Sequence, residues 1–464
     1  MTTLAEQIVS EACKVPFAQI PQATVARAKL FLLDTVGVAL AGRYATGAES
    51  VIDLAVEMGG RAEATILGTA HKVSVPFAAL ANSFMAHARE FDELHERGGA
   101  HVNVCVIPAA LAAAEKKGRV SGRIFLAAMI KGVDLVCRLG IAISLHPGWH
   151  TSSVFGGFGA ALASGLILGM EPDVLVNALG LAYSQAAGTR QGRLEGKLAK
   201  RLQPALACKS GVMASLLAHK GITGPKEWLE GLWGIARVYG CSPEAIDVDA
   251  IAAIKSHLSQ VFLGDDLSFK LYPCCKVTHT SIEAALLLTR ENALNADEIE
   301  AVKVRVSRGA YSTVGHPFEP GTNPQVDAQF SIPYTVALAL TRGRVTLDGF
   351  EDAAIRDPQI RRLAAKIQVE VDPEMKDASA NMVNLATALT IYTQRGIFFK
   401  KLATCKGHPA NPAREEELCQ KFRDCAHFGQ TLSQAQIEQT LQLICNLEDV
   451  EDIQELLVHL RTPA

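Results

Sequence analysis

The sequence contains few aromatic residues, no C-x-x-C pair and no apolar run that approaches the ~20 residues of a membrane span. Its 11 cysteines are scattered, which argues against a zinc site or an iron–sulfur cluster and favours free thiols in a reducing compartment. The N-terminal residues match neither a signal peptide nor a transit peptide. We therefore expect a cytoplasmic protein with no membrane segment and no bound metal.

A large excess of charge is also missing. The chain has 45 Lys and Arg residues against 48 Asp and Glu residues, a net charge of −3, and no basic block stands out. This balance argues against nucleic acid as a partner. Nearly half of the 464 residues are apolar, so the chain is long and hydrophobic enough to form two or three domains.

Apolar residues recur at helical spacing through the first part of the chain. The predicted helices cover residues 4–13, 22–41, 48–59, 76–92, 105–117, 121–144, 152–169, 173–187, 199–220, 226–239 and 247–259. No alternation of strands and helices interrupts this pattern. The first ~265 residues are therefore predicted to be all-helical.

The hydrophobic period changes after this segment. Residues 301–306 and 367–371 alternate between apolar and polar, as a strand packed on one face does. Two more predicted strands, 385–392 and 397–402, flank a turn at 394–396. The predicted helices of this region cover 279–293, 330–342 and 347–352, and the pattern is helical again from residue 414 onward.

These patterns predict a mainly α fold with two domains. Residues 1–267 together with 409–464 are expected to form a large all-helical domain, and residues 268–408 a smaller α+β domain. The cleft between two such domains is the expected place for a small-molecule site.

The stretch from Glu90 to His101 carries the densest group of acids and imidazoles. A predicted helix end delivers Asp92 and His95, and the Gly98-Gly99 pair allows a turn that brings His101 back toward them. Such a cluster between apolar helices suits acid–base chemistry. A solvated loop with ordinary surface charge explains the stretch equally well.

Two histidines four residues apart, His146 and His150, flank Pro147 and Gly148. The proline and glycine argue against a regular helix, which disfavours a chelating pair, although a metallohydrolase using His95, His101, His146 and His150 remains an alternative. His150 directly precedes a predicted helix start, whose main-chain amides favour an anion. A structural histidine is the competing interpretation.

Cations cluster where a Gly-rich loop runs into a predicted helix. They are Arg190, Arg193, Lys197, Lys200 and Arg201. The G-x-x-x-x-G-K-[ST] pattern of a phosphate-binding loop is absent, so carboxylate binding is the functional interpretation. A solvated basic face is the alternative.

The predicted domain junction offers Lys270, Cys275 and His279 within ten residues. A cysteine nucleophile paired with His279 is conceivable, but no cysteine-hydrolase motif surrounds it. Together with the preceding clusters, these residues suit proton abstraction next to a carboxylate. The cations would bind carboxylates and stabilise enolate-like charge, and a His or Asp would move the proton.

Several short motifs occur in order along the whole chain. They are Leu33-Asp34-Thr35-Val36-Gly37, Phe91-Asp92-Glu93 with His101, Gly148-Trp149-His150, Lys200 before a small-residue helix, Lys270-x-Tyr272-Pro273-x-Cys275 with His279, and the segment 327–334. In this order and spacing they resemble the motifs of the MmgE/PrpD family, which includes 2-methylcitrate dehydratase, cis-aconitate decarboxylase and iminodisuccinate epimerase.

The resemblance implies a large helical domain formed from both chain ends, a smaller α+β lid, a homodimer, and a site between the domains that works without a cofactor. It implies the catalytic candidates Asp92, His101, His150, Lys200, Lys270 and His279. The substrate-binding candidates are Tyr334, which comes from the resemblance alone, Arg190 and Ser331. The implied substrate is a small di- or tricarboxylate.

The sequence departs from the family pattern near the expected pocket. Val102 and Asn103 follow His101 where the family usually has His-Pro-Ser, and Gln203 and Ala205 follow Lys200 where His and Gly are frequent. These changes leave the reaction subtype open. We expect a dehydratase of the 2-methylcitrate type, with a cis-aconitate-type decarboxylase, an iminodisuccinate-type epimerase and a non-catalytic carboxylate-binding dimer as alternatives.

Overall fold

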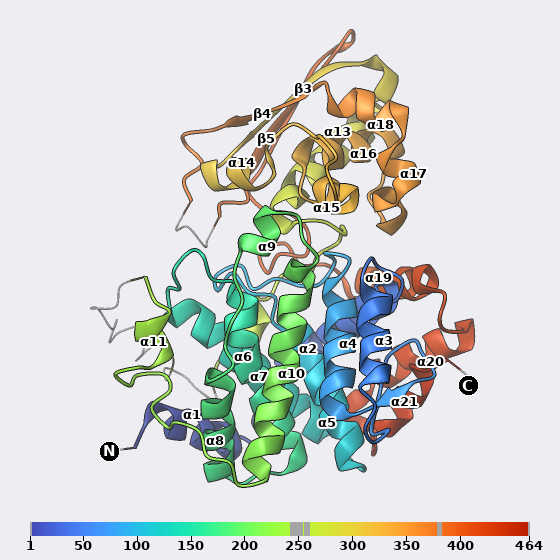
Figure 1. Ribbon diagram of the computed structural model, residues 1–464. Coiled ribbons are helices and arrows are strands. Elements are labelled where there is room, and N and C mark those ends of the chain that lie inside the picture. The colour runs from blue at the N-terminus through green and yellow to red at the C-terminus, as the bar shows by residue number, and fades with distance from the viewer. Residues whose placement is uncertain (1, 242–253, 255–259, 378–382, 463–464) are drawn as a thin grey trace.

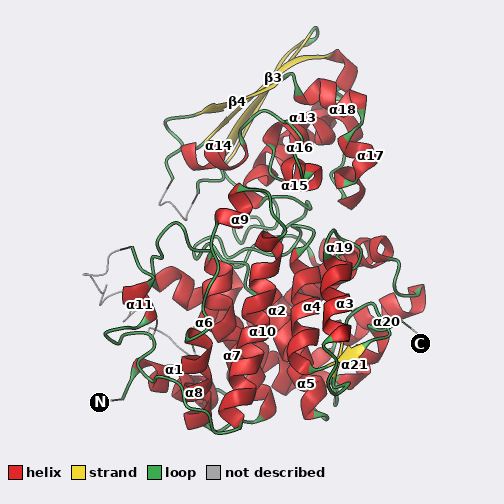
Figure 2. Cartoon of the chain, in the orientation of Figure 1, coloured by secondary structure: helices red, strands yellow, loops and turns green. Residues whose placement is uncertain are grey.

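The computed structural model describes residues 2–241, 254, 260–377 and 383–462. A body of packed helices lies below a smaller layer of strands and helices, as Figures 1 and 2 show. The mainly α fold class with a smaller α+β part is therefore confirmed. The helix predicted at 247–259 falls almost entirely outside the described residues.

The helical body begins with long helices that follow one another along the chain. They are α1 (Leu4–Lys14), α2 (Gln22–Ala41), α3 (Ala48–Glu57), α4 (Val75–His87), α5 (Asn103–Lys117), α6 (Gly122–Ala142), α7 (Thr151–Leu168), α8 (Pro172–Tyr183) and α10 (Ala199–His219). Shorter elements are α9 (Gln191–Leu194), α11 (Ile235–Val238), and the 3-10 helices η1 (Phe17–Gln19) and η2 (Leu263–Asp266). The chain returns to this body through α19 (Glu415–Gly429), α20 (Gln434–Cys445), η6 (Leu447–Asp449) and α21 (Gln454–His459).

Small residues let the central helices approach closely. A Cβ added at Gly159 of α7 would lie 2.6 Å from the main-chain O of Gly132 in α6, and one added at Gly211 of α10 would lie 2.4 Å from the O of Gly157. The protein has few aromatic side chains, and close packing of helix backbones fills its core instead. By length and composition α7 passes as a membrane span, yet 89% of it is buried inside the protein, as in a core helix.

Three local predictions for the helical body are wrong. The helix predicted at 76–92 ends at His87, and the chain then forms a loop in which Glu90 has φ +53°. The helix predicted at 226–239 is reduced to α11, and the residues before it form turns in which the main-chain N of Gly231 donates to Glu227 O and that of Gly234 donates to Gly231 O. The body is also not purely helical, because β1 (Ala64–Thr65) and β2 (Lys72–Val73) form a short antiparallel pair.

The smaller part is built on a four-stranded sheet with the order β4-β3-β5-β6. Strand β3 (Ile299–Val306) pairs in parallel with β4 (Ile367–Val371) and antiparallel with β5 (Thr387–Thr393), which forms a hairpin with β6 (Gly396–Leu402). The alternating burial along β3 matches its apolar–polar alternation. Its helical elements are η3 (Lys276–Thr278), α13 (His279–Asn292), η4 (Ala296–Glu298), α14 (Arg308–Val314), α15 (Pro324–Gln329), α16 (Ile332–Arg342), η5 (Leu347–Phe350), α17 (Asp352–Ile355) and α18 (Pro358–Ala364).

The described residues contain two large hydrophobic cores. One joins buried residues between Leu4 and Phe269 with others between Leu418 and Leu460, and the second runs from Cys274 to Ile391. The chain thus crosses between the cores just after Phe269 and returns before Leu418. The boundaries expected from the sequence, 1–267 with 409–464 and 268–408, stay a prediction.

Candidate active site

The loop between α4 and α5 is buried, which excludes a solvated surface loop. Glu90, Asp92, Glu93 and His95 are all at most 2% exposed. The main chain of His95 exchanges two hydrogen bonds with Ala100 and so closes the turn expected at the glycine pair. The acids and imidazoles therefore lie inside the protein at the upper end of the helical body, facing the smaller domain.

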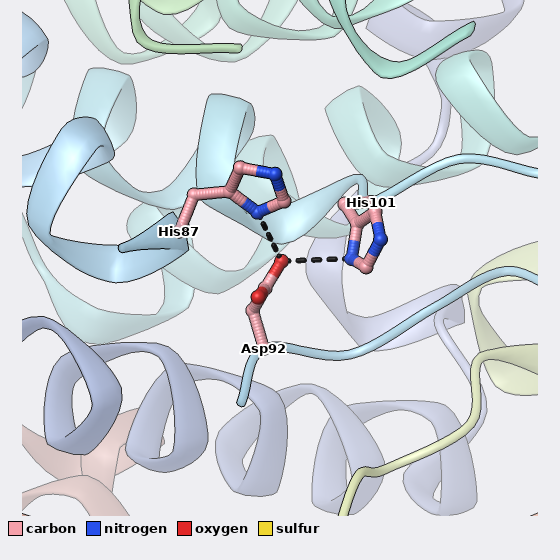
Figure 3. A group of neighbouring side chains, drawn as sticks. All are labelled: His87, Asp92 and His101. Atoms are coloured by element: carbon pink, nitrogen blue, oxygen red, sulfur yellow. Dashed lines mark hydrogen bonds and ion pairs between the residues drawn. The ribbon is translucent and has the colours of Figure 1, made fainter. Parts of the chain in front are cut away.

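Asp92 lies between two histidines, as Figure 3 shows. Its Oδ2 is 2.8 Å from Nδ1 of His87 and 2.8 Å from Nδ1 of His101. Nδ1 of His101 is also 2.6 Å from the main-chain O of Glu93. Because a carboxylate and a carbonyl only accept hydrogen bonds, Nδ1 of His101 carries the proton. In this tautomer the lone pair is on Nε2, where a substrate can reach it.

His87, which the sequence analysis did not select, connects Asp92 to Lys200. Its Nδ1 donates to Asp92, and its Nε2 lies 2.9 Å from Nζ of Lys200, which donates. Burial lowers the pKa of His87 to about 4, and the Lys200 ammonium adds to this effect. His87 is therefore a neutral link between an anion and a cation. The sequence did offer one indication of His87 as a site residue, since it ends an otherwise apolar helix five residues before Asp92.

Glu90 lies between two lysines. Lys200 forms an ion pair with its carboxylate, while Nζ of Lys270 lies 2.9 Å from its main-chain O and 3.7 Å from Oε2. Burial alone would raise the pKa of Glu90, but the two ammonium groups outweigh it and hold the pKa below its usual range. Burial likewise opposes charge on Lys270, yet Asp92 and Glu90 raise its pKa. Burial lowers the pKa of Lys200, and the Glu90 carboxylate opposes this effect.

His150 is at the N-cap position of α7, as the sequence predicted for a helix start. Its Nδ1 lies 2.7 Å from Oγ of Ser153, and Oγ of the neighbouring Ser152 accepts a hydrogen bond from the main-chain N of His101 at 2.8 Å. Burial lowers the pKa of His150 well below its usual range, and Lys200 adds to this effect. The ring is therefore neutral at physiological pH.

A cavity of about 410 Å³ brings most of the predicted residues together. Its walls come from both the helical body and the smaller domain, and they include His101, His150, Arg190, Arg193, Lys200, Lys270, Lys276 and the acids Glu90 and Glu96. The cations outnumber the acids on this surface. A cavity with this charge attracts a small polycarboxylate.

Four predicted residues do not line this cavity, and one of them is Asp92, whose carboxylate contacts the lining residue His101. Ser331 lines an adjoining cavity of about 280 Å³. Tyr334 is fully buried in the smaller domain, where its hydroxyl donates to the main-chain O of Gly349 at 2.6 Å. His279 is also fully buried, with Nε2 at 3.4 Å from the main-chain O of Cys274. The structure places the last two behind the cavity walls.

The structure gives little support to the two alternatives, a cysteine nucleophile and a metal site. Burial raises the pKa of the Cys275 thiol, which disfavours a thiolate nucleophile. In the described part of the chain, His95, His101, His146 and His150 do not form a group with ligand spacing. His87, Asp92 and His101 do form one, with ligand atoms within 4.8 Å of one another. The neighbouring Lys200 ammonium would repel a metal cation there.

The sequence matches two models of one family. Residues 6–245 match the MmgE/PrpD N-terminal domain and residues 272–449 match the MmgE/PrpD C-terminal domain. The chain belongs to the MmgE/PrpD family. The C-terminal match includes helices α19 and α20, which pack on the helical body in this MmgE/PrpD protein.

Curated relatives of this MmgE/PrpD protein fall into two groups. Cis-aconitate decarboxylase of Aspergillus terreus is 27% identical, with 96% of this chain and 93% of the relative covered. Cis-aconitate decarboxylase of Homo sapiens is 27% identical over 95% of this chain and 91% of the relative. 2-Methylcitrate dehydratase of Escherichia coli (strain K12) is 25% identical over 55% of this chain and 54% of the relative. Both groups are lyases, and this protein is an enzyme of the same family.

Proposed function

We propose that this protein is a lyase that acts on a small di- or tricarboxylate through proton transfer at the carbon next to a carboxylate. The observation that carries this proposal is one cavity in which two imidazoles, His101 and His150, face the ammonium groups of Lys200 and Lys270. The cations bind carboxylates and stabilise the enolate-like charge that forms when the carbon loses a group. The imidazoles move the proton.

The hydrogen bonds suggest different roles for the two histidines. His101 presents Nε2 as a base, and the Asp92 carboxylate at Nδ1 stabilises the imidazolium that forms when His101 takes a proton. His150 has no carboxylate at its Nδ1, which contacts Ser153 instead, and its pKa is lowered by burial. We therefore assign the base to His101 and the hydrogen-bond donor, or acid, to His150.

Two reaction subtypes fit this machinery. In dehydration, a proton leaves the carbon for one histidine while the hydroxyl departs with a proton from the other. In decarboxylation, CO₂ leaves and the electron pair left on carbon is protonated. The sequence motifs favoured dehydration of the 2-methylcitrate type. The near full-length alignment with cis-aconitate decarboxylases supports decarboxylation instead, and we propose it as the first reaction to test.

The test is an NMR time course in D₂O with chelator-treated protein and a panel of cis-aconitate, 2-methylcitrate and aspartate-derived dicarboxylates. Loss of CO₂ with deuterium incorporation supports the decarboxylase, whereas water loss supports the dehydratase. Exchange at the α carbon with inversion supports the epimerase. Thermal stabilisation by a carboxylate without turnover would instead support a non-catalytic binding protein.

Three further expectations come from the sequence, two of them from the family resemblance and the location from the scattered thiols and the N-terminal residues. We propose that the protein is a homodimer, that it works in the cytoplasm and that it needs no cofactor. Sedimentation velocity tests the first expectation, and the activity of chelator-treated, dialysed enzyme tests the third.

A further inference from the structure

The guanidinium of Arg201 is buried without a carboxylate partner. Arg201, in the first turn of α10, is 1% exposed. Its hydrogen bonds go to the amide oxygens of Gln329 at 3.0 Å and of Gln325 at 3.4 and 3.5 Å, and its Nε has no partner. Within the described residues no acid forms an ion pair with it. Burial lowers the pKa of Arg201, and only Glu90, at longer range, opposes this.

A buried charge without a counter-ion is costly, so proteins keep one where a ligand supplies the opposite charge. Arg201 lines the cavity of about 280 Å³ that adjoins the catalytic cavity. Arg193 and Lys197 line it as well, and neither forms an ion pair with any residue that the structure describes. A cavity lined by three cations that form no ion pair with any described residue, one of them buried, is a site for an anion.

The acids in this cavity do not cancel that charge. Glu90 is already held by Lys200 and Lys270. Oδ2 of Asp327 accepts a hydrogen bond from the main-chain N of Gly321 at 2.7 Å. Glu319 and Asp327 remain as anions, since a main-chain hydrogen bond does not cancel the charge of a carboxylate, but the three cations outnumber them. The net charge facing the space is therefore positive.

The two cavities meet at one boundary. Glu90, Arg193, Lys200, Thr313 and Phe330 line both of them. A molecule that holds its reacting carbon near His101 and His150 can therefore extend past Lys200 toward Arg201. This continuity makes the smaller cavity an extension of the catalytic one.

We propose that the smaller cavity is an anion subsite, anchored by Arg201, which takes the distal carboxylate of the substrate. The planar guanidinium presents paired N–H groups that match the two oxygens of a carboxylate. This inference rests on the proposed function for the identity of the anion. The existence of the subsite rests only on the unpaired Arg201 and the cavity. A separate inorganic anion is the other source of the same charge.

Calorimetric titration of the full-length protein tests the subsite without any need for turnover. The probes are propane-1,2,3-tricarboxylate, butanedioate, which lacks one terminal carboxymethyl group, and inorganic phosphate. The variants are Arg201→Gln, Arg201→Lys and Lys197→Gln, the last at an exposed position where folding is not at risk. Lys220→Gln, at the exposed far end of α10, is the matched control. Thermal melts establish that each variant is folded.

In Arg201→Gln we expect affinity for the tricarboxylate to fall by about tenfold or more, and affinity for butanedioate to change less than about threefold. Arg201→Lys should recover part of the loss, and Lys197→Gln should show a smaller loss of the same selectivity. Lys220→Gln should match the wild type.

Two results would overturn the subsite: unchanged tricarboxylate affinity in Arg201→Gln, or equal losses for both carboxylates. Phosphate binding that needs Arg201 and adds to tricarboxylate binding would retain the subsite but assign it to a separate anion. A protein that turns over no carboxylate, yet binds the tricarboxylate through Arg201, would refute the proposed function and leave the subsite standing.

Discussion

Lys421 Nζ lies 2.6 Å from Asp34 Oδ1 beneath the loop that carries the site. The same ammonium donates to the main-chain O of Phe91 and of Lys270, each at 2.8 Å. One buried lysine of α19 thus holds α2, the loop at 88–102 and the first crossing between the domains. Its three N–H groups match these three acceptors.

Lys421→Met should lower the free energy of unfolding by about 3 kcal/mol, because it leaves the buried Asp34 without its counter-ion. Activity should fall as well, since Phe91 and Lys270 lose their anchor. Adding Asp34→Asn should recover part of the stability. Urea unfolding measures each value. Arg423→Met on the same helix removes an ion pair with Glu438 that is partly exposed, and it should cost under about 1 kcal/mol.

Lys200→Ala should lower kcat/KM by about 10³-fold, since the substrate loses a fixed cation and His87 loses its donor. The variant should remain folded, because Lys270 still neutralises Glu90. Steady-state kinetics with the substrate found by NMR gives the comparison, and circular dichroism monitors the fold. Wild-type kinetics in this variant would remove Lys200 from the mechanism.

The stability of the protein should depend on His95 at mildly acidic pH. Burial lowers the pKa of His95 to about 4, below the value of about 6.5 in an unfolded chain. Between these values the unfolded state binds a proton that the folded state does not bind. His95 therefore reduces stability progressively as the pH falls from about 6.5 to 4, by up to about 3 kcal/mol.

His95→Leu should flatten this part of the pH–stability curve, measured by urea unfolding at several pH values. His71→Leu, at an exposed histidine, is the control and should leave the curve unchanged. Identical slopes in wild type and His95→Leu would show that His95 is protonated in the folded state.

Glu93 should be replaceable by glutamine with a gain in stability above neutral pH. Burial, reinforced by Asp92, raises the pKa of Glu93 to about 8, while an unfolded glutamate titrates near 4.3. The folded state therefore retains a proton that the unfolded state has lost, and stability falls as pH rises between these values. Glutamine does not titrate, so Glu93→Gln should be more stable at pH 8 by about 1–3 kcal/mol.

In the wild type, Glu93 Oε1 accepts hydrogen bonds from the main-chain N of Val102 and Asn103, at 2.6 and 2.7 Å. The amide oxygen of a glutamine at this position can still accept both of them. Glu93→Ala removes the acceptor and should destabilise the protein at every pH. Thermal melts at pH 6 and pH 8 separate the two effects. A lower melting temperature for Glu93→Gln at pH 8 would contradict a protonated Glu93.

The elements predicted best from the sequence are those in which apolar residues recur at a regular spacing. Strand β4 was predicted with its bounds intact, and the apolar–polar alternation of β3 appears as alternating burial. The helix predicted at 226–239 failed because Gly231 and Gly234, which are poor helix formers, lie in turns. The helix at 76–92 was predicted too long because Glu90 leaves helical geometry and contacts Lys200 and Lys270, which are distant in the sequence.

The site was predictable only where a motif carried it. Asp92, His101, His150, Lys200 and Lys270 carry recognisable motifs, and the structure brings them to one place. His87 was missed because its role depends on two contacts, with Asp92 and Lys200, that no local spacing encodes. Lys421 was missed for the same reason, since its partners lie far away in the sequence.

The return of the chain to the helical body has a consequence for its synthesis on the ribosome. The loop with Glu90 and Asp92 is made early, whereas the helix that fastens it from below, α19, is made after the whole smaller domain. A nascent chain therefore cannot complete the first domain as it emerges, although N-terminal domains often fold first during translation. The loop that carries Glu90 and Asp92 therefore lacks its hydrogen bond from Lys421 until that residue leaves the exit tunnel.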